Sequence, residues 1–144
     1  MRTLNQIVQT LEDLQGTSAL LNNGTFLFGD PWEYGASSKI TYPFMGARLV
    51  SSNLNGKIHT TVINLFFCDL VHKDESNETE VLSDMTLAGM RLYSELKKEL
   101  EDNYPATVND SSSFTPFTER FDDEVSGVEV NISIEQFFDD SICA

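Results

Sequence analysis

Histidine and cysteine are the side chains that most often bind metals or act in catalysis near neutral pH, and this chain has only two of each. His59 and His72 are separated by about 13 steps of roughly 3.3 Å in an extended chain, too far to share a metal ion. His72 with Asp74 could hold a weakly bound cation, but a solvated loop explains the same residues more simply. Cys68 lies in an apolar run with no histidine at a suitable spacing, so we interpret it as a core thiol.

Carboxylates are abundant, at 23 Asp and Glu residues, but none lies in a recognisable catalytic or metal-binding pattern. The acidic groups at 122–124 and 139–140 resemble a calcium site in charge alone, because the ligand pattern of an EF-hand loop is missing. The chain has no glycine-rich phosphate loop and no serine nucleophile elbow. The sequence therefore predicts no catalytic residue, no cofactor and no metal, and we expect a protein that is not an enzyme.

The formal net charge of −14 limits the classes of partner. A protein that grips nucleic acid needs a basic face to neutralise phosphates, so the charge argues against that class. A protein that surrounds DNA without gripping it stays compatible, because a channel wall of like charge repels DNA and lets it pass.

Length and composition predict one folded domain over residues 1–144, since 144 residues with 40% hydrophobic content can bury a core. The N-terminal residues lack the apolar stretch of a secretory signal, and no run of about 18 apolar residues is present to span a membrane. We therefore expect no membrane partner. Cys68 and Cys143 are interpreted as thiols of a reducing compartment.

The longest apolar run, residues 57–71, predicts a strand rich in β-branched and aromatic side chains. From Val62 onward both of its faces are mostly apolar, so we expect a central strand that is covered on both faces. Asn64 interrupts this pattern. Either it is hydrogen-bonded in the core or the strand is uncovered at that point, because an unpaired buried amide costs about 1–3 kcal/mol.

A long helix is predicted from Glu78 to about residue 100. Ser76 or Asn77 can cap its N-terminus. Gly89 costs up to about 1 kcal/mol relative to Ala in such a helix, unless a close neighbour needs the space. The apolar residues that recur at helical spacing and form one stripe are Val81, Met85, Ala88, Leu92 and Leu96.

Shorter elements flank this strand and helix. An amphipathic helix over 3–15 opens the chain, and a strand over 25–28 leads into a loop at 29–38. The Asn-Gly turn at 53–56 predicts that a strand over 39–52 pairs antiparallel with 57–71. Further strands are predicted at 104–108, 113–121 and 128–135, and the last segment, 136–144, is interpreted as a C-terminal arm.

The order of helix, strands, long helix and strands predicts an α+β fold. We expect an antiparallel or mixed β-sheet with the long helix packed on one face and an additional N-terminal helix.

A family resemblance enters through residues 62–84, which read Val-Ile-Asn-Leu-Phe-Phe-Cys-Asp-Leu-Val-His-Lys-Asp-Glu-Ser-Asn-Glu-Thr-Glu-Val-Leu-Ser-Asp. This segment resembles small neck or tail-completion proteins of tailed phages of Bacteroidetes hosts, including crAss-like phages. Upstream, the segment Ile-Thr-Tyr-Pro-Phe at 40–44 is similar to the strand before the hairpin in that group. The close match covers about 39–100, and the order of elements is similar to the tail-terminator fold.

The resemblance implies a structural virion protein. Such proteins form homo-oligomeric rings, often hexamers or dodecamers, between the portal and the tail, and DNA passes through the ring without specific binding. It implies contacts with the portal or with adjacent neck and tail proteins. It also implies a location in the virion neck or tail, after assembly in the host cytoplasm.

On this interpretation four regions are candidate interfaces. The corner between the long strand and the long helix presents Asp69, Lys73, Asp74 and Glu78 either to a neighbouring subunit or only to its own fold, and both alternatives stay open. The loop at 29–38 and the hairpin tip are expected to contact neighbouring ring proteins. The C-terminal arm either docks on a neighbour or closes the core. The candidate residues of these last regions are Trp32, Tyr34, Asn55, Phe137, Phe138 and Ile142.

Two other classes of function remain as alternatives. A small acidic regulator or DNA mimic would carry its carboxylates on one exposed face and bind a basic protein. A small ligand-binding α+β domain or enzyme would have a pocket with convergent polar groups, lined by Trp32, Tyr34, His59 and His72.

Overall fold

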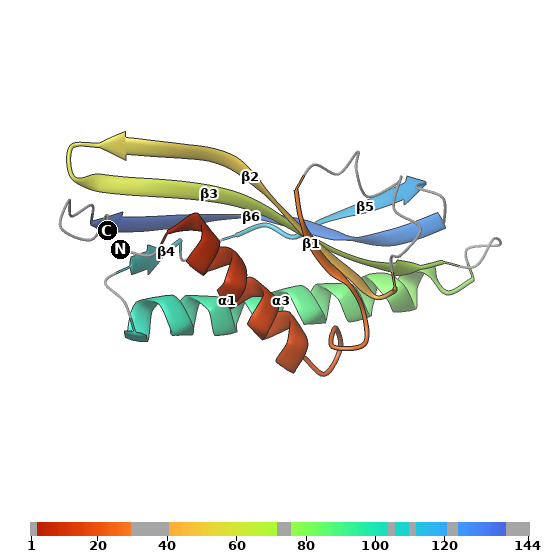
Figure 1. Cartoon of the computed structure of the whole chain (residues 1–144). Coiled ribbons are helices and arrows are strands. Elements are labelled where there is room, and N and C mark those ends of the chain that lie inside the picture. The colour runs from red at the N-terminus through yellow and green to blue at the C-terminus, as the bar shows by residue number, and fades with distance from the viewer. Residues whose placement is uncertain are drawn as a thin grey trace.

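The computed structural model describes residues 3–29, 41–71, 76–103, 106–109, 112–120 and 124–137. Two helices lie under a twisted sheet, with both helices on the same face (Figure 1). The helices are α1 (Leu4–Thr17) and α3 (Glu78–Asn103). The strands are β1 (Phe26–Phe28), β2 (Phe44–Asn55), β3 (Ile58–Leu70), β4 (Ala106–Val108), β5 (Thr115–Arg120) and β6 (Glu124–Phe137).

The sheet has the order β1-β2-β3-β6-β4. β5 also pairs with β6, with residues 124–129, whereas β4 pairs with residues 134–136. All pairs are antiparallel except β1 and β2, so the sheet is mixed. The predicted α+β class, the N-terminal helix and the long helix on one face of the sheet are confirmed. β3 occupies the predicted central position.

The predicted hairpin is formed by β2 and β3, which pair from Phe44 with Cys68 to Asn55 with Ile58. Gly56 has a φ of 62°, a left-handed conformation that glycine adopts without steric cost, which explains the turn at this point. The register shifts between Leu49 and Ser51, where β2 has a bulge.

The core lies between the sheet and the helices. β3 directs Ile63, Leu65 and Phe67 toward α3, and all three are fully buried. Each side chain of this size stabilises the fold by about 1.5–3 kcal/mol when it leaves water. The predicted apolar stripe of α3 packs against this layer, and the predicted alternation of β6 places its apolar side chains there: Val128, Val130, Ile132 and Ile134.

Gly89 is buried in α3 because the aromatic rings above it occupy the space of a side chain. A Cβ atom at this position would lie 3.1 Å from the rings of Phe67 and Phe114. The helix therefore has a packing reason for its poorest helix former.

The opposite face of the sheet carries a second, smaller cluster of Phe44, Phe66, Cys68 and Val125. The Phe66 ring lies 5.9 Å from that of Phe44, between centroids. β3 is thus covered on both faces only toward its C-terminal end, whereas Ile58 at its start is exposed.

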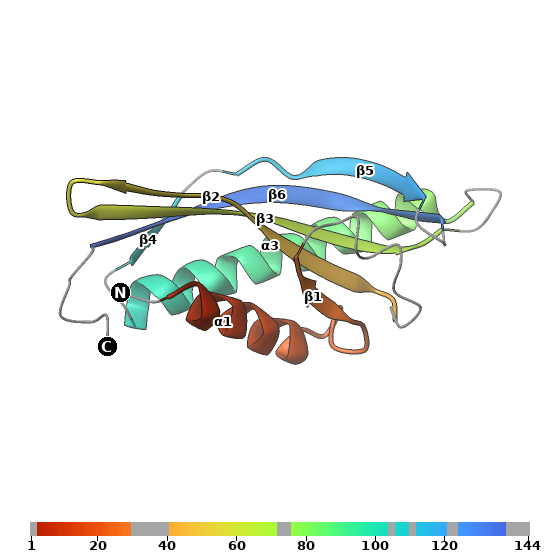
Figure 2. The same ribbon diagram turned by 45° about the horizontal axis from the view of Figure 1, so that its top comes forward.

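α1 begins with a capping box in which the Thr3 side chain accepts a hydrogen bond from the Gln6 amide and the Gln6 side chain accepts one from the Thr3 amide. It continues to Thr17, two residues beyond the predicted end. Ile7 and Leu11 face the core, and α1 lies beside α3 under the sheet (Figure 2).

Candidate functional site

The structure describes four of the ten predicted interface residues: Asn55, Asp69, Glu78 and Phe137. The six others lie outside the described residues: Trp32, Tyr34, Lys73, Asp74, Phe138 and Ile142. The predicted arm at 136–144 is described as far as Phe137, and these first two residues continue β6.

Asn55 and Phe137 lie at one end of the sheet, where three strands are in register. Asn55 pairs with Ile58, and Ile58 pairs with Phe137 on its other side. The Lys57 ammonium group lies 5.9 Å from the centroid of the Phe137 ring, within the range of a cation–π contact. The hairpin tip and the beginning of the predicted arm therefore form one continuous surface.

This end of the sheet exposes large apolar side chains. Leu54 is 52% exposed, Ile58 43% and Phe137 52%. In β2 all eight residues from 48 to 55 are exposed. The sequence predicted contacts for the hairpin tip at 53–56 and singled out Asn55, but it missed Lys57 and Ile58, although their position beside a predicted turn at the end of two long strands was a usable signal.

Hydrogen bonds connect the end of β3 and the start of α3 to each other and to β6. The Asp69 carboxylate accepts a 2.8 Å bond from the Leu70 amide, and the Asn77 side chain donates to the Leu70 carbonyl at 3.3 Å. The Glu78 carboxylate accepts a 3.3 Å bond from the buried Ser126 hydroxyl of β6. These bonds fix the start of α3 against the sheet, and a contact with a neighbouring subunit stays a prediction.

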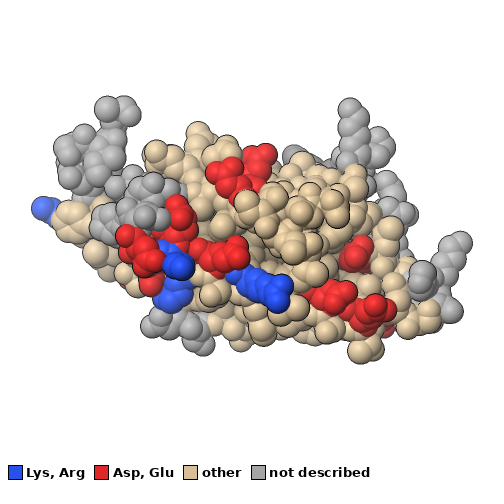
Figure 3. Space-filling view, turned by 90° about the horizontal axis from the view of Figure 1, so that it is seen from below, with Lys and Arg blue, Asp and Glu red and all other residues tan. Residues whose placement is uncertain are grey.

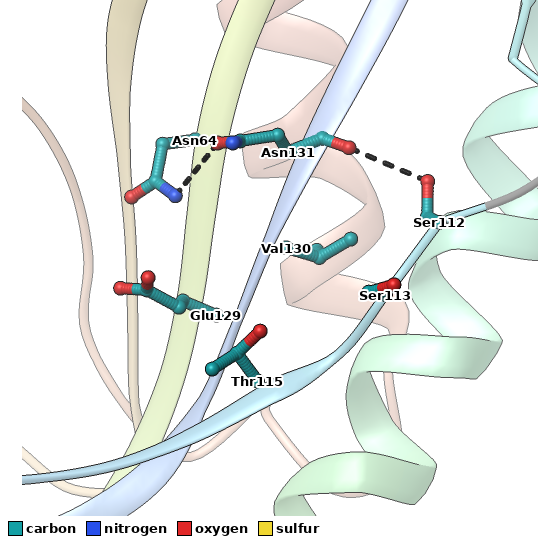
Figure 4. Close-up of a pocket in the computed structure, with 7 residues that line it drawn as sticks. All are labelled: Asn64, Ser112, Ser113, Thr115, Glu129, Val130 and Asn131. Atoms are coloured by element: carbon teal, nitrogen blue, oxygen red, sulfur yellow. Dashed lines mark hydrogen bonds between the residues drawn. The ribbon is translucent and has the colours of Figure 1, made fainter.

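A polar depression of about 270 Å³ lies on the face of the sheet opposite the helices. Figure 4 shows the Asn64 side chain donating a 2.9 Å hydrogen bond to the Asn131 side-chain oxygen, and the Ser112 hydroxyl donating to the Asn131 carbonyl. Asn64 is only 8% exposed, and its side chain is hydrogen-bonded, which was one of the two alternatives for this residue. It also lies on the face of the sheet opposite α1 and α3. The residues that line the depression are Asn64, Ser112, Ser113, Thr115, Glu129, Val130 and Asn131.

His59 lies next to Ile58 in β3 and pairs with Leu54 of β2. Its Nε2 atom is 2.8 Å from the Ser52 hydroxyl, and its Nδ1 atom is 3.4 Å from the Thr61 hydroxyl. Both ring nitrogens are thus engaged by neighbouring strand residues, and His59 does not line the depression. His72 lies outside the described residues.

Within the described part of the chain, no group of three or more His, Cys, Asp or Glu side chains is placed to hold a metal ion. Cys68 is fully buried in the smaller cluster. Among the described helices, none is long and apolar enough to cross a membrane.

Comparison with known proteins gave no match: neither the models of known families nor the curated proteins match this sequence.

Proposed function

We propose that this protein is a structural subunit of a tailed bacteriophage virion, which forms a ring between portal and tail through which DNA passes. The observation that carries the proposal is the exposed half of β2. β1 pairs only with residues 45–47 of this strand, and the outer edge from 48 to 55 has no strand partner in the described part of the sheet. Long exposed edges with apolar side chains favour association with another chain, so this surface suits a subunit of an assembly.

The fold supports the same proposal. An N-terminal helix, a long β-hairpin, a long helix and further strands follow one another in the order implied by the resemblance to tail-terminator-like proteins. The resemblance covers the hairpin and α3, the two elements that dominate the molecule (Figure 1).

Charge fits a DNA conduit. α1 and α3 together carry nine acidic residues and three basic ones. Figure 3 shows these acidic side chains spread over the helix layer. A ring lined by such a surface would repel the DNA backbone instead of binding it. On this proposal the partners are further copies in a hexamer or dodecamer and the portal or an adjacent neck or tail protein, and the ring belongs to the virion neck after assembly in the host cytoplasm.

The proposal is tested by the native mass of the protein, measured over a concentration series alone and after co-expression with the products of the adjacent genes. We expect a cyclic oligomer in at least one of these samples, visible as rings by electron microscopy. A truncation after Phe137 tests the remaining arm without cutting β6. A strict monomer in every sample, or one that instead binds a basic protein, would refute the ring.

A second candidate function is favoured by the polar depression beside Asn64 and Asn131. Its amides, hydroxyls and one carboxylate fit a small polar ligand such as a saccharide. A panel of such ligands, screened by thermal shift and compared with an Asn131→Leu variant, tests it. Stabilisation of the wild-type protein alone would support a ligand site.

A further inference from the structure

Both ends of the molecule expose apolar side chains, with Ile58 and Phe137 near the hairpin turn and Leu87 and Met90 in the first half of α3. β3 runs from the hairpin turn to the corner that precedes α3, so the hairpin and the start of α3 lie at opposite ends of the long axis (Figures 1 and 2). A surface at one end cannot reach the other end of the same chain, but it can reach that of a second copy.

The hairpin-end surface, defined as Lys57, Ile58 and Phe137, is apolar and carries one cation, and Ile58 and Phe137 share a face of the sheet because they pair with each other. Its two apolar side chains, Ile58 and Phe137, are 43% and 52% exposed, and Lys57 lies over the Phe137 ring. The sequence from 34 to 68 contains Lys39, Arg48 and Lys57 but no Asp or Glu, in a chain that carries a net charge of −14. Lys57 therefore supplies the positive charge of this surface, and the nearest carboxylate in the register is Glu135 of β6, two residues before Phe137 on the same face.

The helix-start surface, defined as Glu80, Asp84 and Leu87, is apolar and acidic. These residues follow one another at spacings of four and three, so they form one row on the exposed side of α3. Leu87 is 44% exposed, and Met90 beside it is 50% exposed. Figure 3 shows acidic side chains without Lys or Arg at this end of the helix layer, and acidic and basic side chains together toward the other end.

We propose that the hairpin-end surface of one copy docks on the helix-start surface of the next, with Lys57 facing Glu80 and Asp84. The inference rests on the proposed ring function and names the contact that would build the ring. Identical copies of a strongly acidic chain repel one another, so association needs a place where opposite charges meet. Because the two surfaces differ and lie at opposite ends, the contact is heterologous, and such contacts repeat head to tail until a ring closes.

Charge exchange tests this contact in the full chain. Lys57→Glu and Asp84→Lys are each expected to weaken self-association about tenfold or more, because each replaces an attraction by a repulsion. The double variant Lys57→Glu/Asp84→Lys is expected to recover most of the loss, since the charges are exchanged. Lys98→Glu and Glu12→Lys are matched controls that make the same charge changes at exposed positions outside both surfaces.

The measurement is sedimentation velocity together with native mass spectrometry, at low and high salt, alone and with the co-expressed neighbours. Circular dichroism and melting temperature establish that each variant is folded. A mixture of the two single variants adds a further test, because alternating copies meet only at wild-type or charge-exchanged contacts and should assemble where each single variant alone does not.

The outcomes separate this inference from the proposed function. The contact is supported if both single variants lose self-association, the double variant recovers it and the two control variants assemble like the wild type. If both charge-reversal variants form the same oligomers as the wild type, the proposed contact is wrong and the ring can still stand. The same conclusion follows if Lys57→Glu abolishes self-association and the double variant does not restore it. A wild-type protein that stays monomeric with and without its neighbours would overturn both.

Discussion

Asn64 and Asn131 face each other across β3 and β6, and the side-chain amide of Asn64 donates a 2.9 Å hydrogen bond to the side-chain oxygen of Asn131. The two residues are 67 positions apart in the chain. Their bond joins the two central strands on the face that the helices leave open, and it supplies the partner that a nearly buried amide needs.

We expect Asn64→Ala to lower the free energy of unfolding by about 1 kcal/mol, because it removes one hydrogen bond and leaves the Asn131 oxygen to partial hydration. The double variant Asn64→Leu/Asn131→Leu should cost less than the sum of the single variants Asn64→Leu and Asn131→Leu, since neither polar partner is then left alone. Urea unfolding of the four proteins gives the coupling energy. Additive effects would show that the bond contributes nothing, and Asn53→Ala at an exposed position of β2 serves as the control.

Glycine 127 sits where β6 crosses close to β3, opposite Cys68. A Cβ atom at this position would overlap the Phe67 carbonyl oxygen and lie 2.7 Å from the Cys68 Cα. Because both neighbours are backbone atoms of a central strand, Gly127→Ala should destabilise the protein by about 3 kcal/mol or more.

Gly16→Ala is the matched control for this substitution. Nothing lies within 4 Å of the added Cβ atom near the end of α1, so this change should be neutral or stabilise by up to about 1 kcal/mol. Melting temperatures of both variants decide the matter, and similar values for the two would contradict the close approach at Gly127.

The parts of the fold that follow from local pattern could be predicted from the sequence. The 3.6-residue period of α3 and the alternation of β6 placed Leu92 and Ile132 in the core, because one periodic face must leave water. The Asn-Gly turn placed β2 beside β3 for an equally local reason.

Features that depend on distant partners were not predictable in this way. The parallel pairing of β1 with residues 45–47 and the insertion of β6 between β3 and β4 join segments that no local period connects. The same holds for the choice of Asn131 as the partner of Asn64. The exposure of Ile58 was not predicted, because alternation cannot distinguish a covered strand from one that extends beyond its helix layer.

The end of α3 is tied to β4 by a small polar network. The Glu101 carboxylate accepts a 3.0 Å bond from the Val108 amide and a 2.8 Å bond from the Lys97 ammonium group. Lys97 also donates to the Val108 carbonyl at 3.1 Å, so both backbone groups of this buried residue depend on α3.

Glu101→Ala should destabilise the protein by about 1–3 kcal/mol, because it leaves the Val108 amide without its acceptor. Glu101→Gln keeps an acceptor and should cost less than about 1 kcal/mol, the contribution of a partly exposed ion pair. Denaturant unfolding compares both with Glu95→Ala on the exposed side of the same helix. Equal losses for the Ala and Gln variants would mean that charge, and not the amide bond, dominates this connection, and the loss should then shrink in high salt.

The final prediction separates stability from assembly at the hairpin end. Leu54 is 52% exposed, whereas Leu65 on the same hairpin is fully buried. Leu54→Ser should therefore change the free energy of unfolding by less than about 0.5 kcal/mol, and Leu65→Ala should cost about 2–5 kcal/mol.

If the exposed leucine serves subunit contact, Leu54→Ser should weaken self-association while the melting temperature of the monomer stays unchanged. Unfolding at low protein concentration and sedimentation over a concentration series measure the two properties separately. A large loss of stability in Leu54→Ser would place this side chain in the fold of the single chain and would contradict a role of Leu54 in subunit contact.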